Sequence, residues 1–276
     1  MSNILVFNDL STVGNVSLNV VTPALSVLGH NVYPIATAVL SSQTGFDSFY
    51  LDDRLDSLNF IGRELEALDL KIDAILVGYL PSGIGVENLW AIIDFYLKKG
   101  AKLYVDPILG DNGELYSTVD EPLCEFMQEL ICRADYIFPN LTEACLLSGF
   151  DYVDTIYKIN AGMGGEVTKA IGKKLLDMGA ERVIITSILE GDVVTNLYMD
   201  DNLSFSVNRP FEKTGLSGTG DLFSAVVTGC LENNCTQRAS IEKAADFVLE
   251  CVRGTESYRD PKYGMDVSKN LKLLLD

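Results

Sequence analysis

Short runs of consecutive apolar residues alternate along this chain with longer segments in which apolar residues recur every three or four positions. A short apolar run between turn residues is typical of a buried strand, and the longer spacing places one apolar face along a helix. Strand-like runs occupy residues 3–8, 31–38, 74–79, 102–106, 136–139 and 182–187. Helix-like segments occupy residues 14–28, 58–68, 86–98, 121–133 and 165–178. This alternation predicts right-handed βαβ units, and therefore an α/β fold with a mostly parallel central sheet flanked by helices.

The last third of the chain departs from this alternation. Residues 193–199 and 203–208 predict an antiparallel hairpin added to the sheet. Helical patterns follow at residues 221–232, 240–252 and 267–275, whereas residues 151–165 have no clear periodicity. No internal repeat or linker-like stretch interrupts the sequence, so we expect a single domain over residues 1–276.

The charge balance excludes several classes of partner. The chain has 21 Lys and Arg residues against 39 Asp and Glu residues, a net charge of −18. Nucleic acids and anionic membranes bind surfaces rich in Lys and Arg, so neither is expected as a partner. A nucleotide is not excluded, because one pocket can be lined by backbone N–H groups. No apolar run approaches the ~18 residues of a membrane span, and no basic region precedes the first one as in a signal peptide, so we expect a cytoplasmic protein.

Six cysteines occur, at positions 124, 132, 145, 230, 235 and 251, and no two of them form a C-x-x-C pair. All lie in apolar, helix-like contexts, so we expect buried free thiols in a reducing compartment. The only histidine, His30, follows Gly29 at a helix-to-strand turn, where a structural role is the simpler interpretation. A metal site built from Cys and His is therefore not expected.

Polar side chains occur where the predicted strands end. Because the carboxyl ends of parallel strands meet at one edge of the sheet, ligands of such folds bind there. The residues at these positions are Asn8 and Asp9, Ser41 to Gly45, Tyr79, Asp106, Asn140, and Thr186 with Ser187. Six strand ends with polar groups favour a ligand site at this edge more strongly than any one of them does.

A glycine-rich segment at residues 214–221 leads into the apolar start of a predicted helix. Gly218, Thr219 and Gly220 let the loop direct backbone N–H groups toward one point, and the helix start adds unpaired N–H groups and the positive end of its dipole. This arrangement suits a phosphate group. Asp221 at the helix start is then a candidate catalytic base for phosphoryl transfer, although Asp is also a common helix cap.

The segment Gly218-Thr219-Gly220-Asp221, taken with the strand-end residues, resembles the ribokinase-like superfamily and, within it, the pyridoxal kinase branch, over about residues 3–255. The resemblance implies a ribokinase-like three-layer sandwich. It implies an ATP-dependent kinase that phosphorylates the hydroxymethyl group of pyridoxal, pyridoxine or pyridoxamine. It also implies Asp221 as general base, the three residues before it as the anion hole, and Mg²⁺ and a monovalent cation such as K⁺ beside ATP.

Further motifs identify the nucleotide side of this expected site. Residues 106–116, DPILGDNGELY, resemble D-P-V-x-G-D-x-G-x-x-Y, which implies Asp106 and Asp111 near Mg²⁺ and the phosphates. Residues 139–143, PNLTE, resemble P-N-x-x-E, whose Asn and Glu (here Asn140 and Glu143) help place Mg²⁺, largely through water. The residues that the resemblance places near ATP are Asp106, Asn140, Thr186, Ser187, Gly218 and Thr219, and those near the metal are Asp106, Asp111 and Glu143.

On the substrate side, residues 41–46, SSQTGF, resemble S-N-H-T-G-Y, and residues 78–80 match G-Y-L. The resemblance implies a ring pocket formed by Asp9, Leu40, Thr44 and Tyr79. Asp9 stands where many vitamin B6 kinases have Ser, and the stretch DLSTVG that it begins is closer to the S-D-x-S-G-G opening of hydroxymethylpyrimidine kinases. A turn or helix cap is the alternative role of Asp9.

Alternatives to a vitamin B6 kinase remain open. A hydroxymethylpyrimidine kinase or another ribokinase-like small-molecule kinase would share the phosphate loop. A catalytically silent ligand-binding protein on this fold would have no need of Asp221 there. A Rossmann oxidoreductase needs a G-x-G-x-x-G loop after the first strand, and this sequence lacks one. Residues 112–118 are a candidate lid over the site, or else an ordinary surface turn. The expected partners are the small-molecule substrate and a second copy of the chain, in a homodimer.

Overall fold

The computed structural model describes residues 1–212, 215–256 and 258–275, so Thr214, which opens the glycine-rich segment, lies outside the described residues. Within them, nine strands form one sheet in the order β11-β10-β9-β8-β5-β4-β1-β2-β3. The strands from β9 to β2 in this order are parallel to one another, whereas β3, β10 and β11 are antiparallel to their neighbours. The predicted α/β fold with a mostly parallel sheet, and the hairpin at one edge, are confirmed.

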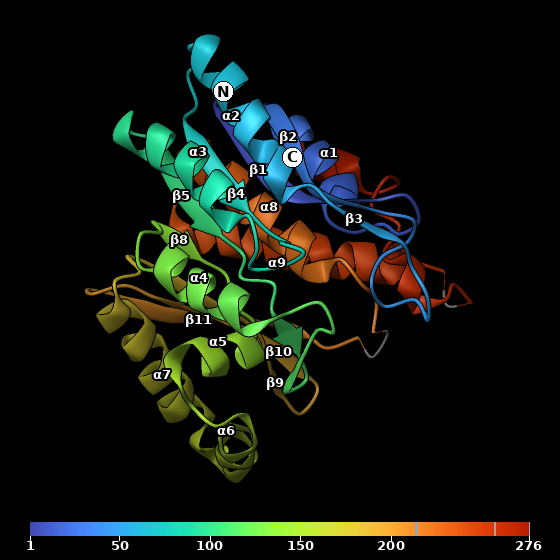
Figure 1. Cartoon of the computed structure of the whole chain (residues 1–276). Coiled ribbons are helices and arrows are strands. Elements are labelled where there is room, and N and C mark those ends of the chain that lie inside the picture. Colours follow the sequence, from blue (N-terminus) through green and yellow to red (C-terminus); the bar gives the residue numbers. More distant parts are fainter. Residues whose placement is uncertain (213–214, 257, 276) are drawn as a thin grey trace.

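The elements have the following bounds (Figure 1). The strands of the sheet are β1 (Asn3–Ser11), β2 (Asn31–Leu40), β3 (Leu51–Asp53), β4 (Ala74–Val77), β5 (Lys102–Val105), β8 (Tyr136–Ile137), β9 (Val183–Glu190), β10 (Val193–Met199) and β11 (Ser204–Pro210). A separate hairpin consists of β6 (Gly110–Asp111) and β7 (Glu114–Leu115). The α-helices are α1 (Leu18–Val27), α2 (Leu58–Ala67), α3 (Val86–Lys98), α4 (Glu121–Ile131), α5 (Leu141–Ser148), α6 (Tyr152–Lys158), α7 (Gly164–Met178), α8 (Thr219–Glu232) and α9 (Gln237–Gly254). Short turns of other helix types are η1 (Leu55–Ser57), η2 (Ile159–Met163), η3 (Pro261–Tyr263) and η4 (Leu271–Leu274).

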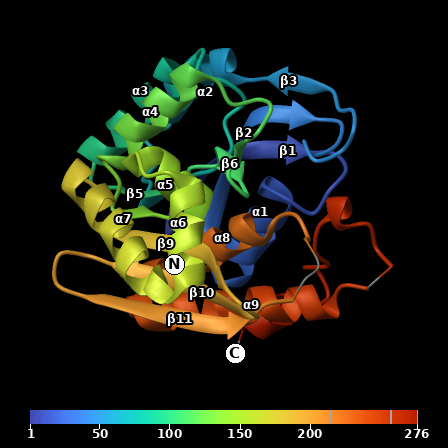
Figure 2. The same cartoon turned by 90° about the horizontal axis from the view of Figure 1, so that it is seen from below.

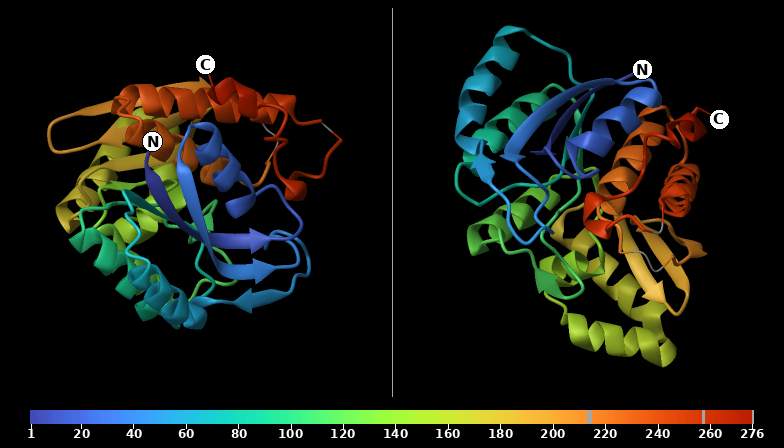
Figure 3. Two further views of the ribbon diagram at one scale, coloured as in Figure 1. Left: turned by 90° about the horizontal axis from the view of Figure 1, so that it is seen from above. Right: turned by 90° about the vertical axis from the view of Figure 1, so that its right-hand side faces the viewer.

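The sheet separates two hydrophobic cores. On one face Ile4 and Val6 of β1 pack with α1, α8 and α9, and on the other Leu5 and Phe7 pack with α2, α3, α4, α5 and α7. Successive side chains of a strand point to opposite faces, so a strand covered on both sides is a continuous apolar run. The right-hand view of Figure 3 has the blue strands between the two groups of helices. This arrangement is the three-layer sandwich expected from the sequence.

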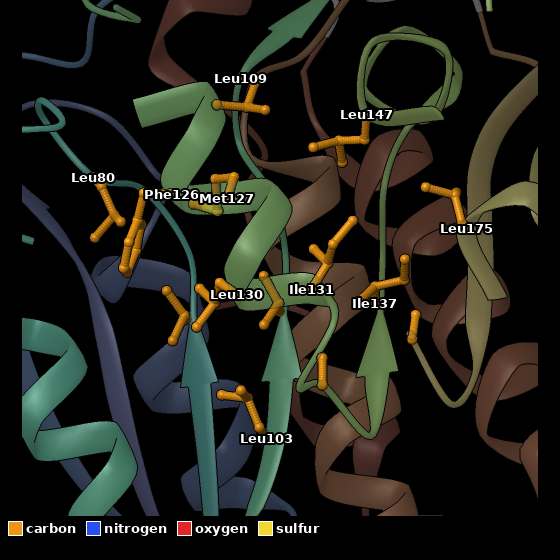
Figure 4. Close-up of a cluster of buried hydrophobic side chains, with 14 of the residues drawn as sticks. Leu80, Leu103, Leu109, Phe126, Met127, Leu130, Ile131, Ile137, Leu147 and Leu175 are labelled. Atoms are coloured by element: carbon orange, nitrogen blue, oxygen red, sulfur yellow. The ribbon is translucent and has the colours of Figure 1, made fainter. Parts of the chain in front are cut away.

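Figure 4 shows the second core at the middle of the sheet. Met127, Leu130 and Ile131 of α4 lie over the sheet and share one buried cluster with Leu103 of β5 and Ile137 of β8. Leu130 and Leu103 are fully buried. Burying a leucine side chain contributes about 1.5–3 kcal/mol, so Leu130 and Leu103 help to hold α4 against the sheet.

The expectation of six buried thiols is wrong for Cys235, which is exposed, and for Cys124 and Cys132, which are partly exposed. Two other expectations are wrong, and both concern short segments. Residues 151–165 contain α6, whose start is fixed by Asp151, because the Asp151 side chain accepts a hydrogen bond from the backbone N–H of Asp154. The helix expected at residues 267–275 is only the short turn η4. There Val267 and Leu274 are both buried in the first core, and this tertiary packing overrides the local helical pattern.

Other differences are smaller. The three-residue strand β3 was not predicted because its sequence, Leu-Asp-Asp, lacks an apolar run. Within the described residues no helix combines the length and the apolar character that crossing a membrane requires. The expectation of one domain over residues 1–276 stays a prediction.

The order of the strands reverses between β1 and β4. From β1 the chain passes to β2 on one side, and it later returns to β4 on the other side of β1. In parallel α/β sheets a crevice forms at such a point, beyond the carboxyl ends of the strands. The pairing of β1 with β2 also shifts register between Asn8 and Leu10, because Thr37 and Ala38 of β2 oppose Asp9 alone; this bulge in β2 lies where both strands approach the crevice.

Candidate active site

Helix α8 begins beside the ends of these strands with a glycine-lined turn. Its N-cap residue is Gly218, whose φ of 84° is a left-handed conformation that favours glycine. A Cβ atom on Gly218 would collide with the backbone oxygen of Asn15, whereas Gly220 has open space around it. The first intrahelical bond runs from the N–H of Leu222 to the oxygen of Gly218 at 3.1 Å. The N–H groups of the first three helical residues therefore have no partner within the helix and, with the helix dipole, form a cradle for an anion.

Asp221 is the third residue of α8 and lies against the end of β1. Its Oδ1 accepts a hydrogen bond from Asn8 Nδ2 at 3.0 Å, and its Oδ2 accepts one from the N–H of Ser17 at 3.0 Å. Because Gly218 is the cap residue, these bonds do not serve to cap α8. Burial raises the pKa of Asp221 to about 6; the bond from Ser17 opposes this rise and the negative charge of Asp9 adds to it. The carboxylate is a stronger base than an Asp on the surface.

Other carboxyl groups lie at the ends of β5 and β8. Asp106 follows β5 and is buried, and burial together with the charge of Asp221 raises the pKa of Asp106 to about 7. Burial, and then the charge of Asp106, raises the pKa of Glu143 in the first turn of α5. Burial also raises the pKa of Asp111. Like charges that share a buried site need protons or a cation to balance them.

Carboxylate oxygens are the donors that Mg²⁺ prefers, and Mg²⁺ is usually held by one or two of them together with phosphates and water. Both oxygens of Glu143 are already engaged: Oε1 accepts from the N–H of Leu109 at 3.0 Å and Oε2 from the N–H of Asn140 at 2.8 Å. Within the residues described, no group of three or more His, Cys, Asp or Glu side chains is arranged to hold a metal ion. A magnesium ion fits beside Asp106 only if phosphate oxygens or water complete its coordination.

The P-N-x-x-E motif has a local structural role. Asn140 and Glu143 form a capping box at the start of α5, in which Asn140 Oδ1 accepts from the N–H of Glu143 at 3.0 Å. Asn140 Nδ2 donates to the oxygen of Gly110 at 2.8 Å. Thr186 pairs with Asn140 through a bridge and is buried, and Ser187 beside it is exposed with a φ of 57°. The contacts of these residues with ATP stay predictions.

The buried carboxyl of Asp106 leads to a test by thermal unfolding. The folded-state pKa of about 7 lies above 3.8, the pKa of an ordinary Asp side chain, so the stability contributed by the neutral form is fully present below 3.8 and is lost as the pH rises through about 7. We expect Asp106→Asn to raise Tm by at least ~3 °C at pH 8 in the presence of a chelator. The gain should shrink as the pH falls to 4.

The matched control is Asp201→Asn, which removes one negative charge at an exposed position. Its Tm should follow the wild type at both pH values. An Asp106→Asn variant that unfolds at or below the wild-type temperature at pH 8 would contradict an ionised carboxylate held at this position.

The predicted substrate residues gather at the ends of β1, β2 and β4. Leu40 and Tyr79 are buried in one small apolar cluster, and the Tyr79 hydroxyl donates to Thr118 Oγ1 at 3.1 Å. Asp9 is buried and accepts from Ser11 Oγ at 2.8 Å, and burial raises its pKa. The charge of Asp9 acts on both Tyr79 and Asp221, so the predicted pocket lies within electrostatic reach of the predicted base. Thr44 lies half-buried in the loop that follows β2.

The candidate lid, residues 112–118, contains the turn and the second strand of the hairpin β6–β7. Asn112 and Gly113 have φ values of 53° and 84°, as a two-residue type I′ turn requires. The N–H of Gly113 donates to Thr142 Oγ1 at 2.9 Å, which ties the tip of the hairpin to the start of α5. In Figure 2 the hairpin, in green, lies on the side of the sheet where β1 and β2 end. This position suits a cover over the cradle, and that role stays a prediction.

A segment that the motifs did not indicate completes the surroundings of the site. Residues 261–265, here called the clasp, run between three loops. The N–H groups of Asn15 and Ser217 donate to backbone oxygens of the clasp at 2.9 and 3.3 Å, and Gln43 Nε2 donates to another at 3.0 Å. The left view of Figure 3 has this red segment beside the blue loop between β1 and α1. The clasp thereby joins the phosphate loop to the loops that follow β1 and β2.

The chain is similar to several known proteins. The model of the phosphomethylpyrimidine kinase family matches residues 29–266. A pyridoxal kinase of Dictyostelium discoideum is 31% identical over 257 residues, which cover 85% of this chain and 80% of that protein. A hydroxymethylpyrimidine/phosphomethylpyrimidine kinase of Bacillus subtilis is 27% identical over 257 residues, covering 92% and 83%. A Bacteroides thetaiotaomicron protein, provisionally described as a phosphomethylpyrimidine kinase and crystallised with pyridoxal, is 33% identical with a TM-score of 0.91, covering 99% of this chain and 95% of that chain.

Proposed function

This chain belongs to the phosphomethylpyrimidine kinase family, and we propose that it is an ATP-dependent kinase of the hydroxymethyl group of pyridoxal, pyridoxine and pyridoxamine. The observation that carries the proposal is the Asp221 carboxylate, held by two hydrogen bonds beside the N–H cradle of α8. A terminal phosphate in the cradle and an alcohol next to Asp221 would be placed for direct transfer.

The reaction follows from these two parts. Asp221 accepts the proton of the substrate hydroxyl as the hydroxyl oxygen attacks the terminal phosphorus of ATP. The bond between this phosphorus and the bridging oxygen breaks, and ADP leaves with the electron pair. The loop of Gly218, Thr219 and Gly220, with the unpaired N–H groups at the start of α8, holds the transferred phosphoryl group while its charge redistributes. The products are ADP and the phosphorylated alcohol.

We propose that the nucleotide binds at the carboxyl ends of β5 and β8 and at Thr186 and Ser187 of β9. Asp106 and Asp111 would hold Mg²⁺, with Glu143 acting through water because its oxygens accept backbone hydrogen bonds. The ion supplies positive charge that offsets the phosphates. A requirement for K⁺ rests on the family resemblance alone. The further ATP contacts that we propose are Asn140, Thr186, Ser187, Gly218 and Thr219.

The substrate pocket is proposed between Asp9, Leu40, Thr44 and Tyr79. Leu40 and Tyr79 supply an apolar surface for a flat ring, and Asp9 supplies a hydrogen-bond acceptor for a ring phenol or a protonated ring nitrogen. The Dictyostelium relative is a pyridoxal kinase, and the Bacteroides protein was crystallised with pyridoxal, which supports a vitamin B6 substrate. The Bacillus relative favours hydroxymethylpyrimidine as the second candidate.

A comparison of substrates tests the proposal. We expect ADP release with ATP and Mg²⁺ when pyridoxal, pyridoxine or pyridoxamine is added, with kcat/KM at least about tenfold higher than for hydroxymethylpyrimidine or ribose. Ribose has no flat ring for the apolar surface of Leu40 and Tyr79 and leaves the pocket poorly filled. The amino group of hydroxymethylpyrimidine can pair with Asp9, so the expected preference over this compound rests on the Dictyostelium and Bacteroides proteins.

A higher kcat/KM for hydroxymethylpyrimidine would transfer the assignment to the second candidate. Binding of pyridoxal without any ADP release would instead identify a catalytically silent ligand-binding protein. The Asp221→Asn variant is the blank for each substrate, since only transfer at this site should disappear with it.

Two further parts of the proposal concern the context of the enzyme. A homodimer is proposed by analogy with relatives, and sedimentation velocity at micromolar concentration measures it. A cytoplasmic location is proposed because all six cysteines, each within the described residues, are free thiols.

A further inference from the structure

Asn8 lies where the order of the strands reverses, and it connects two strand ends to the base. Its side chain is 3% exposed. Asn8 Oδ1 accepts hydrogen bonds from the N–H of Asp9 and the N–H of Tyr79, both at 3.0 Å. Asn8 Nδ2 donates to Asp221 Oδ1 at 3.0 Å. One amide group therefore joins the ends of β1 and β4 to the start of α8.

The orientation of this amide is fixed by its partners. Because both N–H groups point at Oδ1, the opposite orientation would set the amide nitrogen against two donors and its oxygen against the Asp221 carboxylate. Gly78 provides the space that the amide needs, since a Cβ atom there would lie 2.5 Å from Asn8 Nδ2. Gly78 itself is held in the sheet by its N–H, which donates to the oxygen of Phe7 at 2.8 Å.

The second oxygen of Asp221 is fixed from another direction. The N–H of Ser17, which donates to Oδ2, belongs to a residue with a φ of 50°, a conformation that is uncommon for serine. With one donor on each oxygen, the carboxylate cannot rotate without losing a bond. Each oxygen can accept more than one hydrogen bond, so a position for a substrate hydroxyl remains.

We propose that Asn8 is a positioning residue for phosphoryl transfer, which holds the Asp221 carboxylate in line with the cradle of α8, and that Gly78 is needed to keep Asn8 in place. The inference rests on the proposed function. Residues 29–266, matched by the family model, include Gly78 and Asp221 but not Asn8, so the role of Asn8 follows from the hydrogen bonds alone.

The experiment compares two routes to the same defect. Asn8→Ala removes the donor, and Gly78→Ala displaces it while Asn8 stays intact. We expect each to lower kcat with pyridoxal up to about 10²-fold, the effect of a misplaced catalytic group, while KM for ATP changes less than about threefold. Steady-state ADP release gives both constants, and thermal unfolding sets a temperature at which every variant is folded.

Two controls separate positioning from general damage. Thr37→Ala removes another buried hydrogen bond to the same strand end, from Thr37 Oγ1 to the oxygen of Tyr79 at 2.7 Å. Gly62→Ala forces a Cβ atom to 2.8 Å from Ile92 Cγ1 in the packing of α2 on α3, away from the cradle. Both controls should keep kcat within about threefold of the wild type.

A double variant tests whether Asn8 acts through the base. Asn8→Ala added to Asp221→Asn should lower the remaining rate by less than about threefold, because the bond it removes no longer serves a base. The inference fails if Asn8→Ala and Gly78→Ala keep more than a third of the wild-type kcat, or if Thr37→Ala loses as much as Asn8→Ala. If Asp221→Asn itself turns over at the wild-type rate, the proposed function fails instead.

Discussion

Replacing Asp221 with Asn is expected to lower kcat about 10²–10⁴-fold, the range for loss of a general base. The amide has the shape of the carboxyl group and can still accept the bond from the N–H of Ser17, but it cannot take up the proton of a substrate hydroxyl. Binding of ATP should change little, because the cradle is made of backbone groups. Coupled measurement of ADP release, with calorimetric titration of ATP, gives both quantities.

The matched control is Asp154→Asn. Asp154 is also the third residue of a helix, in the first turn of α6, and it carries the same charge near a helix start away from the cradle. Its kcat should equal that of the wild type. Near-normal turnover of Asp221→Asn would show that another group accepts the proton, and equal losses in both variants would point to a general effect of charge.

Gly218→Ala is expected to have the second-largest effect, because it changes the cradle itself. The φ of 84° costs an L-residue about 1–2 kcal/mol, and the new Cβ atom would collide with the backbone oxygen of Asn15. The turn must move, which shifts the N–H groups that hold the phosphoryl group. Loss of one such donor lowers kcat about 10²–10³-fold, and we expect a loss of this size here.

Gly29→Ala isolates the free-energy cost of placing an L-residue at a positive φ. Gly29 has a φ of 90° in the turn between α1 and β2, and nothing lies within 4 Å of the Cβ position there. It should lower the free energy of unfolding by about 1–2 kcal/mol without changing kcat. Urea unfolding and steady-state kinetics of both variants check this, and a Gly218→Ala enzyme as active as Gly29→Ala would mean that the cradle does not depend on the turn.

Much of the fold could be predicted because the apolar pattern is simple where strands are covered on both faces. β1 and β4 are continuous apolar runs since their alternate residues enter different cores. β3 could not be predicted, because its residues gain their place from pairing with β2 and not from their own pattern. The expectations for residues 151–165 and 267–275 were wrong for reasons that the apolar pattern does not contain. A cap at Asp151 starts α6, and burial of Val267 and Leu274 in the first core limits the helical structure after residue 267.

The candidate site divides in the same way. Asp221 and the glycine loop are contiguous in sequence, so their chemistry could be inferred before the structure. The bond between Asn8 and Asp221 joins residues 213 positions apart, and no local pattern indicates it. Two local patterns do indicate structure: the N-x-x-E spacing, interpreted above as a metal-placing motif, also forms the capping box of Asn140 and Glu143, and the Asn-Gly pair forms the type I′ turn at the tip of β6–β7.

The clasp has a consequence for dividing the protein. Residues 261–265 follow α9 and hold the phosphate loop to the loops after β1 and β2, while the strands of the sheet come from earlier in the chain. If the chain were divided into two polypeptides between α9 and Pro261, the first would contain the whole sheet and the second would contain the clasp. Phosphotransfer would then report reassembly of the halves, which makes this junction the natural place to build a split-enzyme sensor.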